Sequence, residues 1–114
     1  MSIFRRRAVN TSRTLTGVGT ILSAAHHDKS TGKIHGHTWE VVAWFHYDGT
    51  DFAVRKYLLD QVVSRLDHNC LPDKIAWGEA LARYIGDAIN SEHDSCIAVD
   101  VNRPLERIYA RWER

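Results

Sequence analysis

The sequence lacks the features that mark secreted, membrane-spanning and nucleic-acid-binding proteins. It holds only two cysteines, Cys70 and Cys96, too few for a disulfide framework and without the spacing of a zinc knuckle. No stretch approaches the ~20 consecutive apolar residues that cross a bilayer. Positive side chains exceed negative ones by one, so no overall field draws the chain to nucleic acid or to an anionic membrane. We therefore expect a cytoplasmic protein that binds neither.

What is present matches one ordinary globular domain, and we treat residues 1–114 as a single unit. Hydrophobic residues make up 44% and charged residues 25% of the chain, enough for a modest core and a soluble surface. The one charge run, Arg5 to Arg7, lies near an end, where a solvated segment is usual. The residues that follow it are too polar for a secretory signal.

The apolar pattern changes from extended to helical and back. β-branched and aromatic residues without a helical period predict strands, and apolar residues three and four apart predict amphipathic helices. Two strands, two helices and two strands are expected in that order, over residues 13–27, 34–47, 52–66, 77–90, 96–101 and 107–112. The last two strands connect across residues 102–104. The first helix is expected to bury one face, formed by Phe52, Val54, Tyr57, Leu58, Val62 and Leu66.

This ββααββ order predicts an α+β fold, with both helices on one face of an antiparallel sheet. The second and fourth strands carry large apolar side chains on both faces. Trp39 and Val41 alternate with Val42 and Trp44 along the second strand. A sheet covered on one side needs only one apolar face, so we expect an oligomer that covers the other.

Three histidines form the main candidate site. His35 and His37 are two apart on a predicted strand, so both point to one side of the sheet and can bind one ion. A hairpin with the first strand brings His26 opposite them. Three imidazoles suit Zn²⁺ and leave a fourth position for water or substrate. The alternative is that His35 and His37 are surface histidines on a polar edge.

The remaining histidines are weaker candidates. His27 and His46 are expected on the other face of their strands. His93 is expected in a solvent-exposed loop.

Five short motifs, in order, resemble those of the 6-pyruvoyltetrahydropterin synthase family, which includes 6-carboxytetrahydropterin synthase. They are Ser23-Ala24-Ala25-His26, His35-Gly36-His37-Thr38-Trp39-Glu40-Val41, Asp51-Phe52, Leu66-Asp67-His68 and Gly78-Glu79-Ala80-Leu81-Ala82. The resemblance covers the chain from about residue 20 onward. It implies the tunnelling fold, assembled around a central barrel as a hexamer of two stacked trimers.

The resemblance also implies chemistry. Zn²⁺ would be held by His26, His35 and His37, in a site between subunits that acts on dihydroneopterin triphosphate or a related pterin. Triphosphate would be eliminated or the side chain cleaved by proton transfers, in pterin or queuosine (7-deazapurine) precursor metabolism. Asp67 and His68 would form the proton relay, the carboxylate orienting the imidazole. The alternative for this pair is a helix C-terminus, where a histidine meets the helix dipole.

The sequence departs from the family in its chemistry. Thr31 stands where the family has its catalytic cysteine, and a hydroxyl is not a usable base near pH 7. Cys70, two residues after His68, is a weak substitute and is expected to be a half-buried structural cysteine. We therefore expect a lyase with altered base chemistry. The alternatives are an inactive zinc protein that binds a pterin or nucleotide, and a purely structural zinc.

Substrate contacts are also altered. The Pro-Thr that precedes the family's helix glutamate is replaced by Ala76-Trp77, although Glu79 itself is present as a substrate-binding candidate. The glutamate that anchors the pterin edge corresponds to Arg103 without gaps, or to Asp100 if the preceding loop is shortened. Arg103 cannot accept hydrogen bonds from that edge and would favour a phosphate or carboxylate ligand instead.

Overall fold

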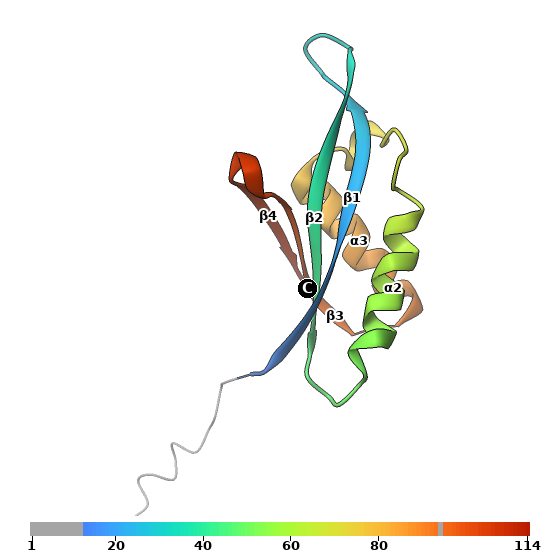
Figure 1. Cartoon of the computed structure of the whole chain (residues 1–114), viewed down its shortest axis with the longest axis vertical. Helices are drawn as coiled ribbons and strands as arrows, with labels where there is room; N and C mark the ends of the chain where they lie inside the picture. The colour runs from blue at the N-terminus through green and yellow to red at the C-terminus, as the bar shows by residue number, and fades with distance from the viewer. Residues whose placement is uncertain (1–12, 94) are drawn as a thin grey trace, which may run out of the picture.

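The computed structural model describes residues 13–93 and 95–114, so the expectation for Arg5 to Arg7 lies outside the described part. The main elements are β1 (Leu15–His27), β2 (Ile34–His46), α2 (Phe52–Ser64), α3 (Gly78–Glu92), β3 (Cys96–Arg103) and β4 (Ile108–Glu113). Two single 3-10 turns, η1 (Asp73–Ile75) and η2 (Pro104–Glu106), lie between them. The strands form one antiparallel sheet in the order β1-β2-β3-β4 (Figure 1).

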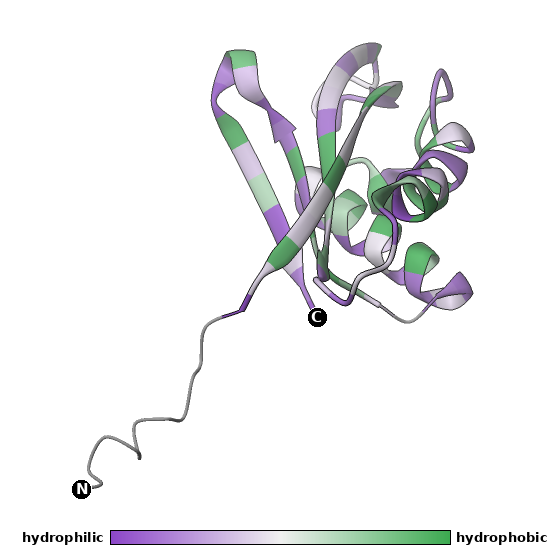
Figure 2. Ribbon diagram, turned by 60° about the horizontal axis from the view of Figure 1, so that its bottom comes forward, coloured by the Kyte–Doolittle hydropathy of each residue, from purple (hydrophilic) through white to green (hydrophobic). Residues whose placement is uncertain are grey.

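Both helices lie on one side of this sheet (Figure 2), which confirms the α+β prediction. The β1–β2 hairpin pairs without a break from Leu15 opposite His46 to His27 opposite Ile34. Asp28 organises its loop, because the carboxylate accepts hydrogen bonds from the Ser30 amide at 2.8 Å and from the Ser30 hydroxyl at 2.6 Å. The two strands are thereby held in fixed register up to the hairpin loop.

The predicted connection between the last two strands is wrong by two residues. Asn102 and Arg103 still pair with Tyr109 and Ile108, so β3 continues to Arg103. The chain turns at η2, where Pro104 begins the turn and Arg107 ends it in the left-handed conformation with φ 58°. Proline suits the first position of a helical turn because it needs no hydrogen bond there.

The core lies between the helices and the facing side of the sheet. Its strand residues alternate along β1 and β2, as expected when one face of a sheet is buried. The largest fully buried side chains are Phe45, Leu22, Leu59, Leu81, Ile85, Ile89, Val41, Val99 and Val101. Gly86 of α3 has no side chain because a Cβ there would lie 2.2 Å from the Trp112 ring of β4.

The buried face of α2 differs from the prediction. Phe52 and Tyr57 are 69% and 62% exposed, whereas Arg55 is only 3% exposed and lies among the core-facing residues. The Arg55 guanidinium lies 4.7 Å from the Phe45 ring and forms a 2.9 Å ion pair with Asp48. An arginine can bury its stem and stack its planar head on an aromatic ring, which the hydrophobic pattern alone does not reveal.

The other face of the sheet is covered by neither of the two helices in the described part of the chain. Ile21 and Tyr109, on the strands at the two edges, are 58% and 66% exposed there. An oligomer that covers this face stays a prediction. Among the described helices, none is long and apolar enough to cross a membrane.

Candidate metal centre

His26, His35 and His37 meet at the hairpin end of the β1–β2 pair. His26 lies directly opposite His35 in the register, and His37 follows two residues later on the same face. Their ring centroids are 4.5, 4.9 and 4.7 Å apart, and one ligand atom from each lies within 4.8 Å of the others. The three side chains that the sequence singles out therefore form a cluster that can hold one metal ion.

The chemistry of this cluster fits Zn²⁺. Both ring nitrogens of His26 are buried without a hydrogen-bond partner in the described part of the chain, an arrangement that is costly unless a ligand binds them. Burial lowers the pKa of His26, and the charges of His35 and Arg103 lower it further. Burial and the Arg103 charge likewise lower the pKa of His37. Neutral imidazole is the form that ligates zinc.

Aromatic and charged side chains surround the histidines on the helix side of the sheet. The Trp77 ring lies 5.2 Å from the His26 ring, edge to face, at the start of α3. Arg103 of β3 places its Nη1 3.5 Å from His37 Nε2 and forms an ion pair with Glu106. A cavity of about 240 Å³ adjoins them, lined by His26, Trp77, Glu79 and Arg103, among others.

Asp67 and His68 lie at the outer edge of β1, just past the end of α2. Asp67 Oδ1 accepts a hydrogen bond from the Ser23 amide at 2.8 Å, and Asp67 Oδ2 lies 2.8 Å from His68 Nδ1. The hydrogen bond from the Ser23 amide is the main cause that holds the pKa of Asp67 below its usual value, and the contact with His68 lowers it further. The His68 amide donates to the Ser23 carbonyl at 2.6 Å, and its backbone is left-handed with φ 60°. The pair is thus fixed to the strand while the His68 side chain is 81% exposed.

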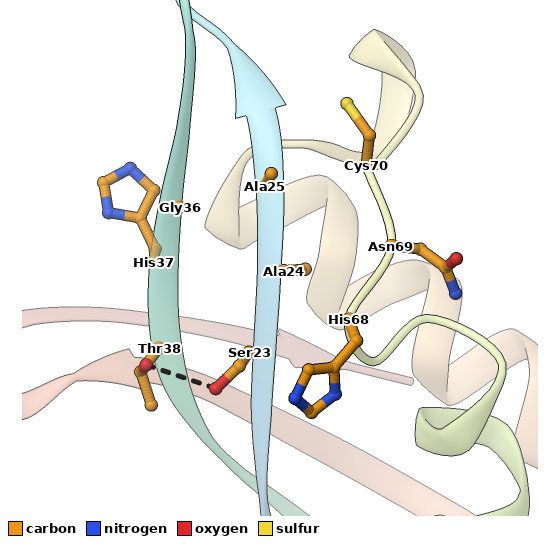
Figure 3. A pocket seen from close by; sticks show the side chains of 9 residues that line it. All are labelled: Ser23, Ala24, Ala25, Gly36, His37, Thr38, His68, Asn69 and Cys70. Carbon is orange, nitrogen blue, oxygen red and sulfur yellow. Dashed lines mark hydrogen bonds between the residues drawn. The ribbon is translucent and has the colours of Figure 1, made fainter.

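This pair does not face the histidine cluster of the same chain. Figure 3 shows the His37 ring on one side of the β1–β2 pair and the His68 ring beyond β1 on the other. A cavity of about 450 Å³ lies at this edge of the sheet, and His37 and His68 both help to line it, together with Ser23, Thr38 and Cys70. The structure therefore brings the three metal candidates together, and His68 lies outside that cluster, across β1 from His37.

Both the position of the family cysteine, Thr31, and its weak substitute, Cys70, are exposed. Thr31 is in the hairpin loop, where its hydroxyl accepts a hydrogen bond from the Lys33 amide at 3.2 Å. Cys70 is exposed, so the expectation of a half-buried cysteine is wrong. It joins the edge of β1 through a bridge to Ala25, and its Sγ lies 4.0 Å from His27 Nδ1. Sequence reasoning missed this contact because the two residues are 43 positions apart.

The substrate-binding candidates divide between the two faces of the sheet. Asp100 pairs with Val42 on the uncovered face, where it accepts hydrogen bonds from Trp44 Nε1 at 2.8 Å and Arg111 Nε at 2.7 Å. Arg103 lies on the helix side beside His37, and Glu79 lies in the first turn of α3 beside the same cavity. Only Arg103 and Glu79 are therefore near the histidine cluster in one chain.

The remaining histidines are exposed, as expected for His93. His27 and His46 are also exposed. Sequence reasoning gave no role to Trp77, which the structure places against His26. Its position two residues before Glu79, where the family has small polar residues, is the signal that could have marked it.

Comparison with known proteins agrees with this geometry. The family model of 6-pyruvoyl tetrahydropterin synthase matches residues 19–111. The 6-pyruvoyl tetrahydropterin synthase of Caenorhabditis elegans is 16% identical with a TM-score of 0.74, covering 90% of this chain and 96% of that chain. The Plasmodium falciparum enzyme is 15% identical with a TM-score of 0.65, covering 91% and 100%.

A third structure is a Plasmodium vivax 6-pyruvoyltetrahydropterin synthase in which a glutamate, named as a catalytic residue, is replaced by cysteine. It is 15% identical with a TM-score of 0.62, covering 89% of this chain and 99% of that chain. No curated protein sequence matches significantly. These structures show the shared fold, and the family model spans most of the sequence. The chain belongs to the 6-pyruvoyl tetrahydropterin synthase family.

Proposed function

We propose that this protein is a zinc-dependent lyase that acts on dihydroneopterin triphosphate or a related pterin, in pterin or queuosine-precursor metabolism. One observation carries the proposal. The His26 imidazole is 3% exposed and has no partner for either nitrogen, yet it faces two other imidazoles at ligand distance. A bound metal would take one of these two nitrogens as a ligand, and three nitrogen ligands leave a coordination position for substrate. A closed structural site would need a fourth protein ligand.

Each residue has a distinct role in this proposal. His26, His35 and His37 hold Zn²⁺, which when bound supplies positive charge that polarises a substrate oxygen. Asp67 accepts the Nδ1 hydrogen of His68 and fixes the ring, which leaves Nε2 to exchange a proton with the substrate side chain. Imidazole suits this step because its pKa lies near neutral pH.

The base chemistry departs from that of a cysteine enzyme. Thr31 supplies no thiolate, and we propose that proton transfer relies on His68. In the Plasmodium vivax relative a glutamate is named as a catalytic residue. Cys70 is exposed and lines the same cavity as His68. The other cysteine, Cys96, is buried.

We further propose that the working site is shared between copies in a cytoplasmic homohexamer. The support is that Asp67 and His68 lie beyond the outer edge of β1, whereas the histidine cluster faces the helix side of the sheet. A relay from one copy placed against the cluster of another would complete the site. Glu79 and Arg103 would then contact the substrate beside the metal. Asp100 lies on the uncovered face, so it would contact substrate only in the site of a neighbouring copy.

The alternative is a zinc protein of the same fold that binds a pterin or nucleotide without turning it over. It is favoured by one observation, the solvent-exposed threonine at the position of the family cysteine.

Metal analysis and product analysis test the proposal together. Purified protein should hold about one zinc per chain, lost in His35→Ala, and should convert dihydroneopterin triphosphate. His68→Ala should keep the zinc and lose turnover, whereas His93→Ala, an exposed histidine remote from the relay, should keep both. Zinc without turnover would favour the binding protein. Absence of zinc would refute the metal centre.

A further inference from the structure

We propose that the cavity beside the histidine cluster is a subsite for an oxyanion, a carboxylate or phosphate group of the ligand, bound by Arg103 and the first turn of α3. This subsite rests on the proposed function, because it requires that the pterin ligand binds at the metal centre. It adds the class of substrate, a pterin-like molecule whose acidic group lies next to the metal.

The cavity is lined by residues of all four strands and of the start of α3. His26 comes from β1, Trp77 and Gly78 from the start of α3, and Arg103 from the end of β3. Its volume of about 240 Å³ has room for a carboxylate or phosphate and the carbon that carries it. The same cavity therefore brings one imidazole of the cluster, His26, and the Arg103 guanidinium to one small group.

Arg103 has donors to offer this group. Its Nε–H is directed to Glu106, and its Nη1 lies 3.5 Å from His37 Nε2. A guanidinium has five N–H groups in a planar fork, so the pair with Glu106 leaves donors suited to a planar or tetrahedral oxyanion. With a metal ion on the imidazoles, Arg103 would face a second positive charge, and an anion between them lowers that repulsion.

The helix-side positions of β3 offer Arg103 as a donor and no side-chain acceptor, so the carboxylate in the lining of this cavity is that of Glu79 on α3. Val99 and Val101 pair with Ala43 and Val41 in the core, so the helix-side positions of β3 are Val99, Val101 and Arg103. None of the three accepts a side-chain hydrogen bond. Asp100 points to the opposite face, where its carboxylate accepts hydrogen bonds from Trp44 Nε1 and Arg111 Nη2.

The first turn of α3 adds amide donors. Its N-cap is Trp77, which makes no side-chain capping hydrogen bond. The first N–H groups of a helix have no partner within the helix and favour negative charge. Gly78 allows this turn to approach β4 closely, because a Cβ there would lie 3.1 Å from Ala110 Cβ.

Other charges around the cavity act in both directions. Glu79 lies in the first turn of α3 and would repel an anion, while Glu106 neutralises part of Arg103. Lys29 lies over the Trp77 ring at 5.4 Å and adds positive charge near the entrance. Removing Arg103 and removing Glu79 should therefore change anion affinity in opposite directions.

The test is isothermal titration calorimetry of the full chain with inorganic phosphate and, separately, with acetate. Both titrations use zinc-loaded and metal-free protein. Arg103→Gln should weaken binding of the tighter anion about ten-fold or more, and Arg103→Lys should weaken it less because charge remains without the fork. Glu79→Gln should tighten it a few-fold. Arg83→Gln, an exposed arginine on α3, should leave it unchanged.

Each result bears on a separate claim. Unmeasurable anion binding by the native protein, or equal affinity in Arg103→Gln with its melting temperature unchanged, would overturn the subsite. The tighter of the two anions identifies the acidic group. Native protein that binds no zinc would refute the metal centre and leave the subsite standing. The subsite is tested separately, by whether anion affinity in the metal-free titration depends on Arg103.

Discussion

Two buried polar side chains show how differently a residue can be accommodated in this core. His26 and Arg55 are each 3% exposed, and each has at least one buried nitrogen without a hydrogen-bond partner among the described residues. Arg55 has an ion-pair partner in Asp48 and an aromatic ring beneath it, so its environment is mostly complete without a ligand. Among the described residues, the His26 ring contacts the rings of His35, His37 and Trp77, and none of them gives it a hydrogen bond. An unsatisfied buried nitrogen therefore points to a ligand at His26 but to packing at Arg55.

Arg55 should contribute to stability mainly through its stem. We expect Arg55→Ala to lower the free energy of unfolding by about 2 kcal/mol, because it removes packing against Phe45. Arg55→Met should cost less than half of that, since it keeps the stem and removes a buried charge with an unpartnered Nη1. Urea unfolding measures both. Equal losses in the two variants would show that the ion pair with Asp48 is the main contribution.

Asp67 should stabilise the fold in a pH-dependent way. The Ser23 amide holds the pKa of Asp67 below its usual value, so its stabilisation is present above the unfolded pKa of about 3.9 and is lost as pH falls through the folded pKa. We expect Asp67→Asn to melt at a lower temperature than the native protein at pH 7. The difference should shrink steadily below about pH 4. A difference that does not vary with pH would contradict a charge-based contribution.

The site was only partly predictable at the level of single residues. His35-Gly36-His37 and His26 could be placed together because strand alternation and one short hairpin suffice to relate them. The choice between Asp100 and Arg103 depended on whether the loop before β3 is shortened, and a loop length that differs from that of a family leaves no pattern in a single sequence. Strand alternation places the two side chains on opposite faces of β3.

Among the elements, α3 and β4 pack most closely at Gly86. A Cβ at this position would lie 2.2 Å from the Trp112 ring, so Gly86→Ala should destabilise the protein by roughly 1–2 kcal/mol despite the better helix propensity of alanine. Trp112→Leu should relieve the overlap, making the double variant more stable than the sum of the single effects predicts. Chemical unfolding of the four proteins measures this coupling. Additive effects would mean that the ring moves aside without cost.

The end of α3 is tied to β3 by one side chain. Asn90 Oδ1 accepts hydrogen bonds from the Ser95 and Cys96 amides at 3.0 and 2.8 Å, and its Nδ2 donates to the Cys96 carbonyl at 2.9 Å. We expect Asn90→Ala to cost about 1–3 kcal/mol in unfolding free energy. Asn90→Asp should cost less because it keeps the acceptor. Ser91→Ala is the matched control on the exposed side, and a loss there equal to that of Asn90→Ala would contradict this role.

The elements themselves could be predicted better than their buried faces. The order of strands and helices is as expected, because apolar periodicity reports it directly. The face of α2 was wrong because Phe52 and Tyr57 are aromatic yet exposed, while Arg55 is charged yet buried. A helix that starts at the sheet edge meets the core over only part of its length, and the sequence does not state where contact begins.

At the scale of the whole molecule, two features are incomplete in one copy. The sheet is covered on one face only, with Ile21 exposed on the other. The proposed relay residue His68 lies beyond β1, across that strand from His37. Assembly of several copies would bury the uncovered apolar face of the sheet. It would also bring His68 of one chain close to the histidine cluster of another.

The last prediction concerns this assembly. We expect the native protein to sediment as an oligomer, and Ile21→Lys to shift it toward the monomer, because a charge on the uncovered face opposes burial. Tyr57→Lys is the matched control, since Tyr57 is similarly exposed, at 62%, but lies on α2 on the opposite side of the sheet. Sedimentation velocity at several concentrations distinguishes the species. A native protein that stays monomeric at all of them would contradict the assembly, and with it a site shared between copies.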